Sequence, residues 1–327
     1  MLSGARLRPG SRLEPKSATP ARYPHPKTLQ RTPVALPVAD PLAEINNVYP
    51  HLGKEKRLIQ LDQAVLLGVV QGLTEFLPVS SDGHLVIFQH LLGLTESQLL
   101  LDVMLHLGTL VAVLVVFRDD LILITRALFR AIIGNHSPPD RNALRLMFLV
   151  ITATFPTAII GLVFKELFES LFASLVAAGA GLLVTGTILW ASRYGSKANK
   201  GIDKISFMNA FIIGVCQSVA ILPGVSRSGT TISVALMMGV ERGLAARFSF
   251  LLAIPAILGA GILQVGDLTT IEPGMGPVIL AGVVISALVG YVALKILLRV
   301  LIAGNFSLFA HYCWVVGLLT LAAAFYG

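Results

Sequence analysis

The sequence predicts an all-α polytopic membrane protein, an inverted-topology repeat of two re-entrant helix hairpins plus six transmembrane helices. Its composition supports this, because 55% of the 327 residues are apolar and only 13% are charged, with a mean hydropathy of +0.79. A typical soluble domain carries about 25% charged residues. The other two observations are a set of long apolar stretches and a pair of interrupted apolar regions that resemble each other.

Residues 1–60 are expected to form a disordered, basic, proline-rich extension. They hold nine of the seventeen prolines, and ten Lys and Arg residues against four Asp and Glu residues, which places +6 of the net charge of +7 here. They contain no long apolar run for a folded core or a signal peptide. Because only +1 remains for residues 61–327, the folded body is not expected to bind nucleic acid.

The spanning segments follow from length, because a transmembrane helix needs about 20 mostly apolar residues. Six stretches meet this requirement: Leu99–Phe117, Leu144–Phe164, Leu171–Trp190, Ala246–Gln264, Gly276–Ile302 and Ser307–Tyr326. Two further regions, Leu61–Leu92 and Ile205–Val240, are apolar overall but are interrupted by LPVSSDGH at 77–84 and LPGVSRSG at 222–229. Each is predicted to be two half-helices that meet inside the bilayer.

The two interrupted regions predict an internal duplication, with repeats at about 61–193 and 205–327. Laying GVVQGLTEFLPVSSDGH from Gly68 over GVCQSVAILPGVSRSGT from Gly214 matches eight positions: Gly68/Gly214, Val69/Val215, Gln71/Gln217, Leu77/Leu222, Pro78/Pro223, Val79/Val225, Ser80/Ser226 and Gly83/Gly229. Three spans follow each copy, so two re-entrant hairpins enter from opposite faces and the repeat is inverted, with its broken helices meeting near the midplane.

Loop charges orient this predicted bundle. Thirteen Lys and Arg residues lie on one side and four on the other, so the positive-inside rule makes the first side cytoplasmic. The first hairpin then opens toward the extracytoplasmic side. The basic extension falls on that side too, against the rule, although charges far from a span weigh little.

Among the ionisable residues of the interrupted regions, Glu75, His84 and Arg227 are the candidates for a functional site. A charge at the centre of a membrane helix costs about 2.5–3.5 kcal/mol on insertion scales, so each needs a reason to be there. Two half-helix N-termini aimed at one volume expose unpaired N–H groups, and Arg227 adds a guanidinium suited to phosphate oxygens. The sequence therefore predicts a site for a phosphorylated ligand.

The same cluster offers parts for phosphoryl transfer. Gln71 and Glu75 are four residues apart on one helix face and offer oxygen ligands for a divalent cation, Mg²⁺ or Ca²⁺. Alternatively, Gln71 and Glu75 form a polar stripe that hydrogen-bonds to a neighbouring helix. A lone His84 is more often structural, but Ser81 lies three residues before it, which predicts a nucleophile and base pair.

Other polar residues receive less weight. His90, His106 and His311 have no matching partner in the sequence and are expected to hydrogen-bond within the bundle or at an interface. Asp102 and Ser249 lie near the starts of corresponding spans and are expected to hold the site residues in place without contacting the ligand. A third group lies at predicted loop positions and is expected to be solvated: Asp119, Asp120, Glu166, Glu169 and Glu241.

Residues 61–327 resemble the undecaprenyl-diphosphatases, the bacitracin-resistance type of integral membrane phosphatase. Three strings carry the resemblance: QGLTEFLPVSSDGHL at 71–85, LPGVSRSGTTIS at 222–233 and FSFLLAIPAI at 248–257. The resemblance implies removal of the terminal phosphate of undecaprenyl diphosphate, in a bacterial inner (plasma) membrane, to give the carrier lipid of cell-wall synthesis.

The resemblance also implies roles for individual residues. Ser81 falls on the suggested nucleophile, His84 on its partner and Glu75 on the second acidic position of a Glu/Gln-x-x-x-Glu motif. The implied substrate-binding residues are Ser80, Ser226, Arg227, Ser228 and Thr231. Gln71 is a departure, since many relatives have Glu there, and it predicts a weaker dependence on the divalent cation.

The sequence is also compatible with other functions. A transporter that flips polyprenyl phosphate would use the same architecture and anion site, although a carrier needs neither a nucleophile nor a proton acceptor. An acid-phosphatase type of lipid phosphatase is disfavoured, because Ser233 stands where its motif places His. A purely structural bundle would not explain Glu75 and Arg227. The sequence leaves open a homodimer, and a phosphoenzyme as against an activated water.

Overall fold

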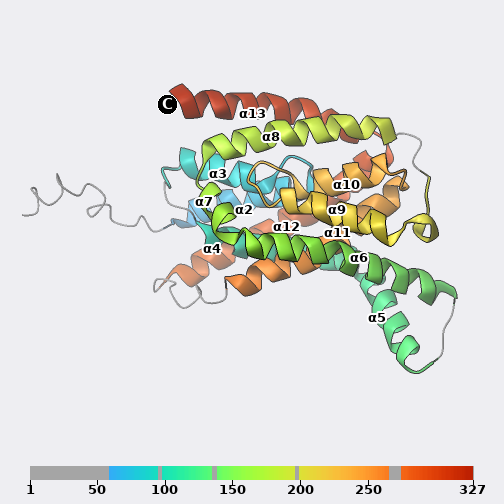
Figure 1. Ribbon diagram of the computed structural model, residues 1–327. Helices are drawn as coiled ribbons and strands as arrows, with labels where there is room; N and C mark the ends of the chain where they lie inside the picture. Colours follow the sequence, from blue (N-terminus) through green and yellow to red (C-terminus); the bar gives the residue numbers. More distant parts are fainter. Residues whose placement is uncertain (1–58, 95–97, 135–137, 196–198, 265–273, 327) are drawn as a thin grey trace, which may run out of the picture. The chain divides into compact units, whose positions relative to one another are not determined.

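The computed structural model describes residues 59–94, 98–134, 138–195, 199–264 and 274–326. Within these ranges the regular structure is helical, apart from one isolated bridge between Lys200 and Val240. The α-helices, labelled in Figure 1, are α2 (Leu61–Phe76), α3 (Ser81–Leu91), α4 (Leu99–Val116), α5 (Arg118–Ile132), α6 (Pro138–Val163), α7 (Lys165–Leu171), α8 (Leu175–Ala191), α9 (Phe207–Val219), α10 (Arg227–Met237), α11 (Arg242–Leu263), α12 (Met275–Ile302) and α13 (Phe309–Tyr326). The predicted extension lies outside the described residues, except for its last two positions.

Six helical segments in the described ranges are long and apolar enough to cross a membrane, which confirms the six predicted spans. They are Leu99–Val116, Asp140–Val163, Leu175–Gly195, Arg242–Leu263, Met275–Ile302 and Phe306–Tyr326. Many of their large apolar side chains remain exposed, for example Phe155, Leu288 and Leu319. Such a surface suits contact with lipid rather than with water.

The segment between the first two spans is more ordered than predicted. It forms helix α5, which exposes Phe129 and Ile132 and packs against α6. Asp120, expected to be solvated, instead forms an ion pair with Arg247 of α11. The expectation of a simple loop was wrong because it weighed only whether the segment could span a bilayer, whereas its apolar residues recur with helical spacing.

Both interrupted regions are broken helices, as predicted. Helix α2 stops at Phe76 and α3 begins at Ser81, while α9 stops at Val219 and α10 begins at Arg227. Each second half begins with the same cap, because the Ser80 hydroxyl accepts from the N–H of Gly83 over 3.2 Å and the Ser226 hydroxyl accepts from the N–H of Gly229 over 3.0 Å. The matched serines thus start both half-helices in the same way.

The helices pack in exchanged pairs. Helix α2 packs on α12, and its counterpart α9 packs on α6, so each broken helix lies against the second span of the other half. The first spans, α4 and α11, contact each other, as do the third spans, α8 and α13, which lie side by side in Figure 1. The two halves are therefore interlocked.

Matched glycines permit close crossings in both exchanged pairs. A Cβ added to Gly68 would lie 2.6 Å from the carbonyl oxygen of Gly282 in α12, and one added to Gly214 would lie 2.1 Å from the carbonyl oxygen of Ala153 in α6. No side chain fits at either distance. Small residues let helix backbones approach closely in membrane proteins, and the duplication retains this device in both halves.

The two breaks contact each other. A Cβ on Gly83 would lie 2.8 Å from the Cα of Gly224, and the hydroxyl of Ser228 donates to the carbonyl oxygen of Phe76 over 3.2 Å. Gly224 has a φ of +88°, which only glycine adopts without strain. The contact between the breaks brings the starts of α3 and α10 to the same region of the molecule.

Candidate functional site

Glu75 is the centre of a buried polar network drawn from both halves of the chain. One carboxylate oxygen, Oε1, accepts from the Arg227 guanidinium over 2.6 Å. The other, Oε2, accepts from the hydroxyl of Ser81 over 2.7 Å and from the side-chain amide of Gln71 over 3.2 Å. Four residues predicted from the sequence are thus in contact, although Glu75 and Arg227 are 152 positions apart.

Arg227 is the first residue of α10 and is held by a second contact. Its guanidinium donates to the carbonyl oxygen of Ser249 over 3.3 Å, and the Ser249 hydroxyl lies 2.6 Å from that of Thr231. Ser249 of α11 therefore supports the arginine, as expected. The guanidinium stays 14% exposed, so it is fixed in direction and still reachable by a ligand.

His84 lies differently from its predicted position. Its Nδ1 donates to the carbonyl oxygen of Ser80, and its Nε2 lies 2.8 Å from the hydroxyl of Tyr312 in α13. The structure does not bring His84 and Ser81 into a hydrogen bond. Three-residue spacing puts both on one side of α3, but the serine turns to the carboxylate of α2, a stronger acceptor, and the imidazole turns to α13.

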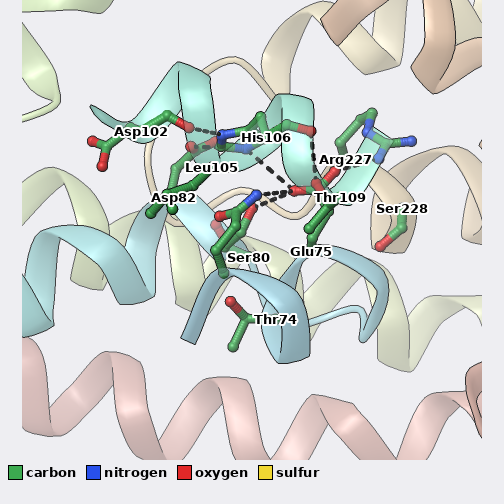
Figure 2. A network of polar contacts seen from close by, with 12 residues as sticks. Thr74, Glu75, Ser80, Asp82, Asp102, Leu105, His106, Thr109, Arg227 and Ser228 are labelled. Carbon is green, nitrogen blue, oxygen red and sulfur yellow. Dashed lines mark hydrogen bonds and ion pairs between the residues drawn. The ribbon is translucent and has the colours of Figure 1, made fainter. Parts of the chain in front are cut away.

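His106 belongs to the network, although the sequence analysis did not place it in the site. Its Nε2 lies 3.2 Å from Glu75 and 3.5 Å from Asp82, and its Nδ1 donates to the backbone carbonyl of Asp102 over 2.7 Å. Figure 2 shows the contacts of His106 and Arg227 converging on the Glu75 carboxylate. A signal for this existed, because Asp102, His106 and Thr109 share one face of an otherwise apolar span.

A cavity of about 460 Å³ lies over this network. Its polar part is lined by members of the network and by further polar residues: Glu75, Ser81, Asp82, His106 and Arg227, and Ser80, Asp102, Gln217 and Ser226. Its remaining walls are mostly apolar and come from α4, α6, α7, α11 and the segment between α9 and α10. The rim carries an ion pair between Lys165 and Glu169 of α7, 3.5 Å apart.

The predicted substrate-binding residues divide into two groups. Ser80, Ser226 and Arg227 line the cavity. Ser228 and Thr231 do not line it, since their hydroxyls bond to the backbone of Phe76 and Arg227, respectively. Asp102 is buried and accepts from Gln89 over 2.6 Å, which places it behind His106 as a support.

Gln71 and Glu75 do not fit a shared divalent cation in this arrangement. Both oxygens of Glu75 already accept from donors, and Gln71 presents its amide N–H to Glu75 while its Oε1 has no hydrogen-bond partner. A shared cation would require this amide to turn over. Among the described residues no three His, Cys, Asp or Glu side chains form a metal-binding group. The divalent cation stays a prediction.

The arrangement suits an anionic ligand with an apolar tail. Arg227 and the starts of α3 and α10 supply donors for phosphate oxygens. The Ser81 hydroxyl already donates to a carboxylate that can accept its proton, which is the geometry of an activated nucleophile. The apolar walls continue from this polar end, so one molecule can contact both.

Comparison with known proteins gives a consistent result. The family described as "Bacitracin resistance protein BacA" matches residues 64–319. A protein of Desulfosudis oleivorans named Undecaprenyl-diphosphatase is 48% identical over 265 residues, which cover 79% of this chain and 97% of the relative. Proteins with the same name from Desulfatibacillum aliphaticivorans and Desulforapulum autotrophicum are 47% and 46% identical, over 80% and 82% of this chain and 98% and 99% of their own lengths.

Proposed function

Because the chain belongs to the bacitracin resistance protein BacA family, we propose that it is an enzyme that hydrolyses undecaprenyl diphosphate to undecaprenyl phosphate and inorganic phosphate. The activity recycles the carrier lipid of cell-wall synthesis and gives bacitracin resistance. One observation carries the proposal for this chain: Ser81, Glu75 and Arg227 meet at the polar end of a cavity with apolar walls. Relatives named Undecaprenyl-diphosphatase, which align with this chain over 97% and 98% of their own lengths, support the same substrate.

The first step uses the hydrogen bond between Ser81 and Glu75. In the covalent route, Ser81 Oγ forms a bond to the terminal phosphorus while its proton passes to Glu75. The bond from that phosphorus to the bridging oxygen breaks, and undecaprenyl phosphate leaves with the electron pair. Water then attacks the phosphoserine, inorganic phosphate leaves and Ser81 regains a proton. Glu75, rather than His84, is the proton acceptor in this scheme.

In the direct route, Ser81 and Glu75 orient a water molecule that attacks the same phosphorus, and Glu75 takes the proton of the water. Arg227 and the two helix N-termini stabilise the charge of the diphosphate in either route. The routes differ in one product. Acid quenching during turnover of substrate radiolabelled in its terminal phosphate leaves label on the protein in the covalent route and none in the direct route.

The apolar part of the cavity is the proposed path of the isoprenoid chain. Thr157 and Ala158 of α6 and Ile257 and Leu263 of α11 line it, and both helices carry exposed apolar side chains. The tail would pass between these helices toward the lipid, while the diphosphate stays at Arg227. A long apolar tail then adds binding energy that the headgroup alone lacks.

We also propose that residues 61–327 are one phosphatase domain built as an inverted repeat, with α2–α3 and α9–α10 as re-entrant hairpins. The exchanged pairs α2–α12 and α9–α6 support this, since a two-fold relation between the halves produces such swapped contacts. Loop charge favours a cavity open to the extracytoplasmic side of a bacterial inner membrane. Cysteine substitutions at Lys165 and at Lys204, labelled from outside intact cells, test this orientation, because the first is expected to react and the second is not.

Three further properties remain predictions within this proposal: a Mg²⁺ or Ca²⁺ requirement, a homodimer, and transport of polyprenyl phosphate by the same site. One experiment addresses the main claim and two of these. Purified protein is assayed for phosphate release from a long-chain polyprenyl diphosphate with and without EDTA, and in vesicles for movement of a labelled polyprenyl phosphate. Absence of phosphate release under all metal conditions, with lipid movement intact, would replace the enzyme by a transporter.

A further inference from the structure

His106 faces the proposed reaction centre and has no part in the mechanism above. It lies on α4, within the first predicted span, and lines the same cavity as Arg227 and Ser81. Its side chain is 18% exposed, so the ring is held by neighbours and still reachable from the cavity. His84, by contrast, does not line the cavity.

The contacts of His106 define which way its ring donates. Nδ1 lies 2.7 Å from the carbonyl oxygen of Asp102, which can only accept, so Nδ1 carries a hydrogen. Nε2 faces the carboxyl groups of Glu75 and Asp82. A ring that donates from both nitrogens is cationic. The Asp102 carbonyl and Asp82 fix its orientation, much as carboxylates and carbonyls orient histidines in other sites.

Arg227 and His106 contact different oxygens of the same carboxylate. Arg227 contacts Oε1 of Glu75 and His106 contacts Oε2. Two cationic donors that meet at one carboxylate are close enough together to bind oxygens of two linked phosphoryl groups. The other Lys or Arg side chain on the described cavity wall is Lys165, which pairs with Glu169 at the rim.

We propose that His106 binds the terminal phosphoryl group of the lipid diphosphate through its Nε2–H, and that Arg227 binds the inner phosphoryl group. The assignment to the terminal group follows from position, because His106 and Ser81 contact the same oxygen of Glu75. Ser81 attacks the terminal phosphorus in the proposed function, on which this inference rests. His106 therefore makes the site selective for a diphosphate over the monophosphate product.

The test measures equilibrium binding of two lipids to the purified full-length protein in detergent. One is a polyprenyl methylenediphosphonate, which cannot be hydrolysed at the bridging position, and the other is the polyprenyl monophosphate. His106→Leu is expected to weaken binding of the diphosphonate about 10- to 100-fold, the value of one charge-assisted hydrogen bond. Binding of the monophosphate should change less than about threefold. His90→Leu, at an exposed position on α3 outside the cavity, is the matched control and should change neither.

A second variant separates donor loss from misfolding. His106→Gln places an amide N–H near the position of Nε2 and is expected to bind the diphosphonate more tightly than His106→Leu. Equal weakening of both lipids in His106→Leu, unchanged binding, or a His106→Gln variant no better than His106→Leu would each overturn the assignment. These results differ from failure of the proposed function, in which the wild-type protein releases no phosphate from any polyprenyl diphosphate.

Discussion

Glu75→Gln is the most informative single substitution, because the structure gives Glu75 two opposing effects on the reaction. The carboxylate accepts the hydrogen bond of Ser81, and it also occupies Arg227 and His106. A diphosphate that uses these two cations must compete with Glu75 for them. The amide of Gln has nearly the same shape but cannot take a proton from Ser81 and carries no charge.

The two effects predict opposite changes in turnover and binding. Loss of a general base lowers kcat about 10²- to 10⁴-fold. A hydrogen bond to a charged group contributes about 1.5–3 kcal/mol, and Gln retains part of it through its carbonyl oxygen. Weaker competition for the two cations should therefore tighten binding of the polyprenyl methylenediphosphonate about tenfold, which is about 1.4 kcal/mol.

The measurements are phosphate release and equilibrium binding of the diphosphonate, both on purified protein. Glu169→Gln is the matched control, since it removes a carboxylate from the rim of the same cavity. That variant should keep its kcat within about threefold. A Glu75→Gln protein that retains wild-type kcat would refute the proton-acceptor role. A folded Glu75→Gln protein that binds the diphosphonate more weakly than the wild type would refute the idea that Glu75 competes with the diphosphate for Arg227 and His106.

Three further predictions concern other parts of the molecule. Gly214→Val should destabilise the protein severely, since a Cβ there meets the α6 backbone, whereas Gly259→Ala, with nothing within 4 Å of its Cβ, should leave the melting temperature of the purified protein nearly unchanged. Gln71→Glu should strengthen the dependence of phosphate release on Mg²⁺ or Ca²⁺, because it adds a carboxylate beside Glu75, and an unchanged metal titration would remove Gln71 from any metal site. Tyr312→Phe removes one hydrogen bond from His84 and should cost about 1 kcal/mol of stability; loss of all phosphate release in a protein that still folds would instead place Tyr312 in the reaction.

The sequence was informative about features that depend on the length of an apolar run or on a break within it. The bilayer thickness sets the length of a spanning helix, so the six spans could be predicted from apolar runs alone. A Pro and Gly cluster in an apolar region indicates a broken helix, and the internal match located the second break from the first. The convergence of Glu75 and Arg227 followed from that match, although it joins residues on different helices.

Side-chain direction was not predictable in the same way. Ser81 and His84 have the spacing of a pair, but the Ser81 hydroxyl bonds to Glu75 of α2 and the His84 ring contacts Tyr312 of α13. His106 was missed for a related reason. Its partners, Glu75 and Asp82, come from two other helices, and only the packing of α4 against α2 brings them together.

The exchanged packing of the halves has a consequence for synthesis. Gly68 of α2 meets Gly282 of α12, more than two hundred residues later in the chain. During translation, α2 is therefore synthesised long before α12, the helix on which it packs. Arg227 is also made 152 residues after Glu75, so the nascent chain carries this carboxylate without its guanidinium partner over that length of synthesis.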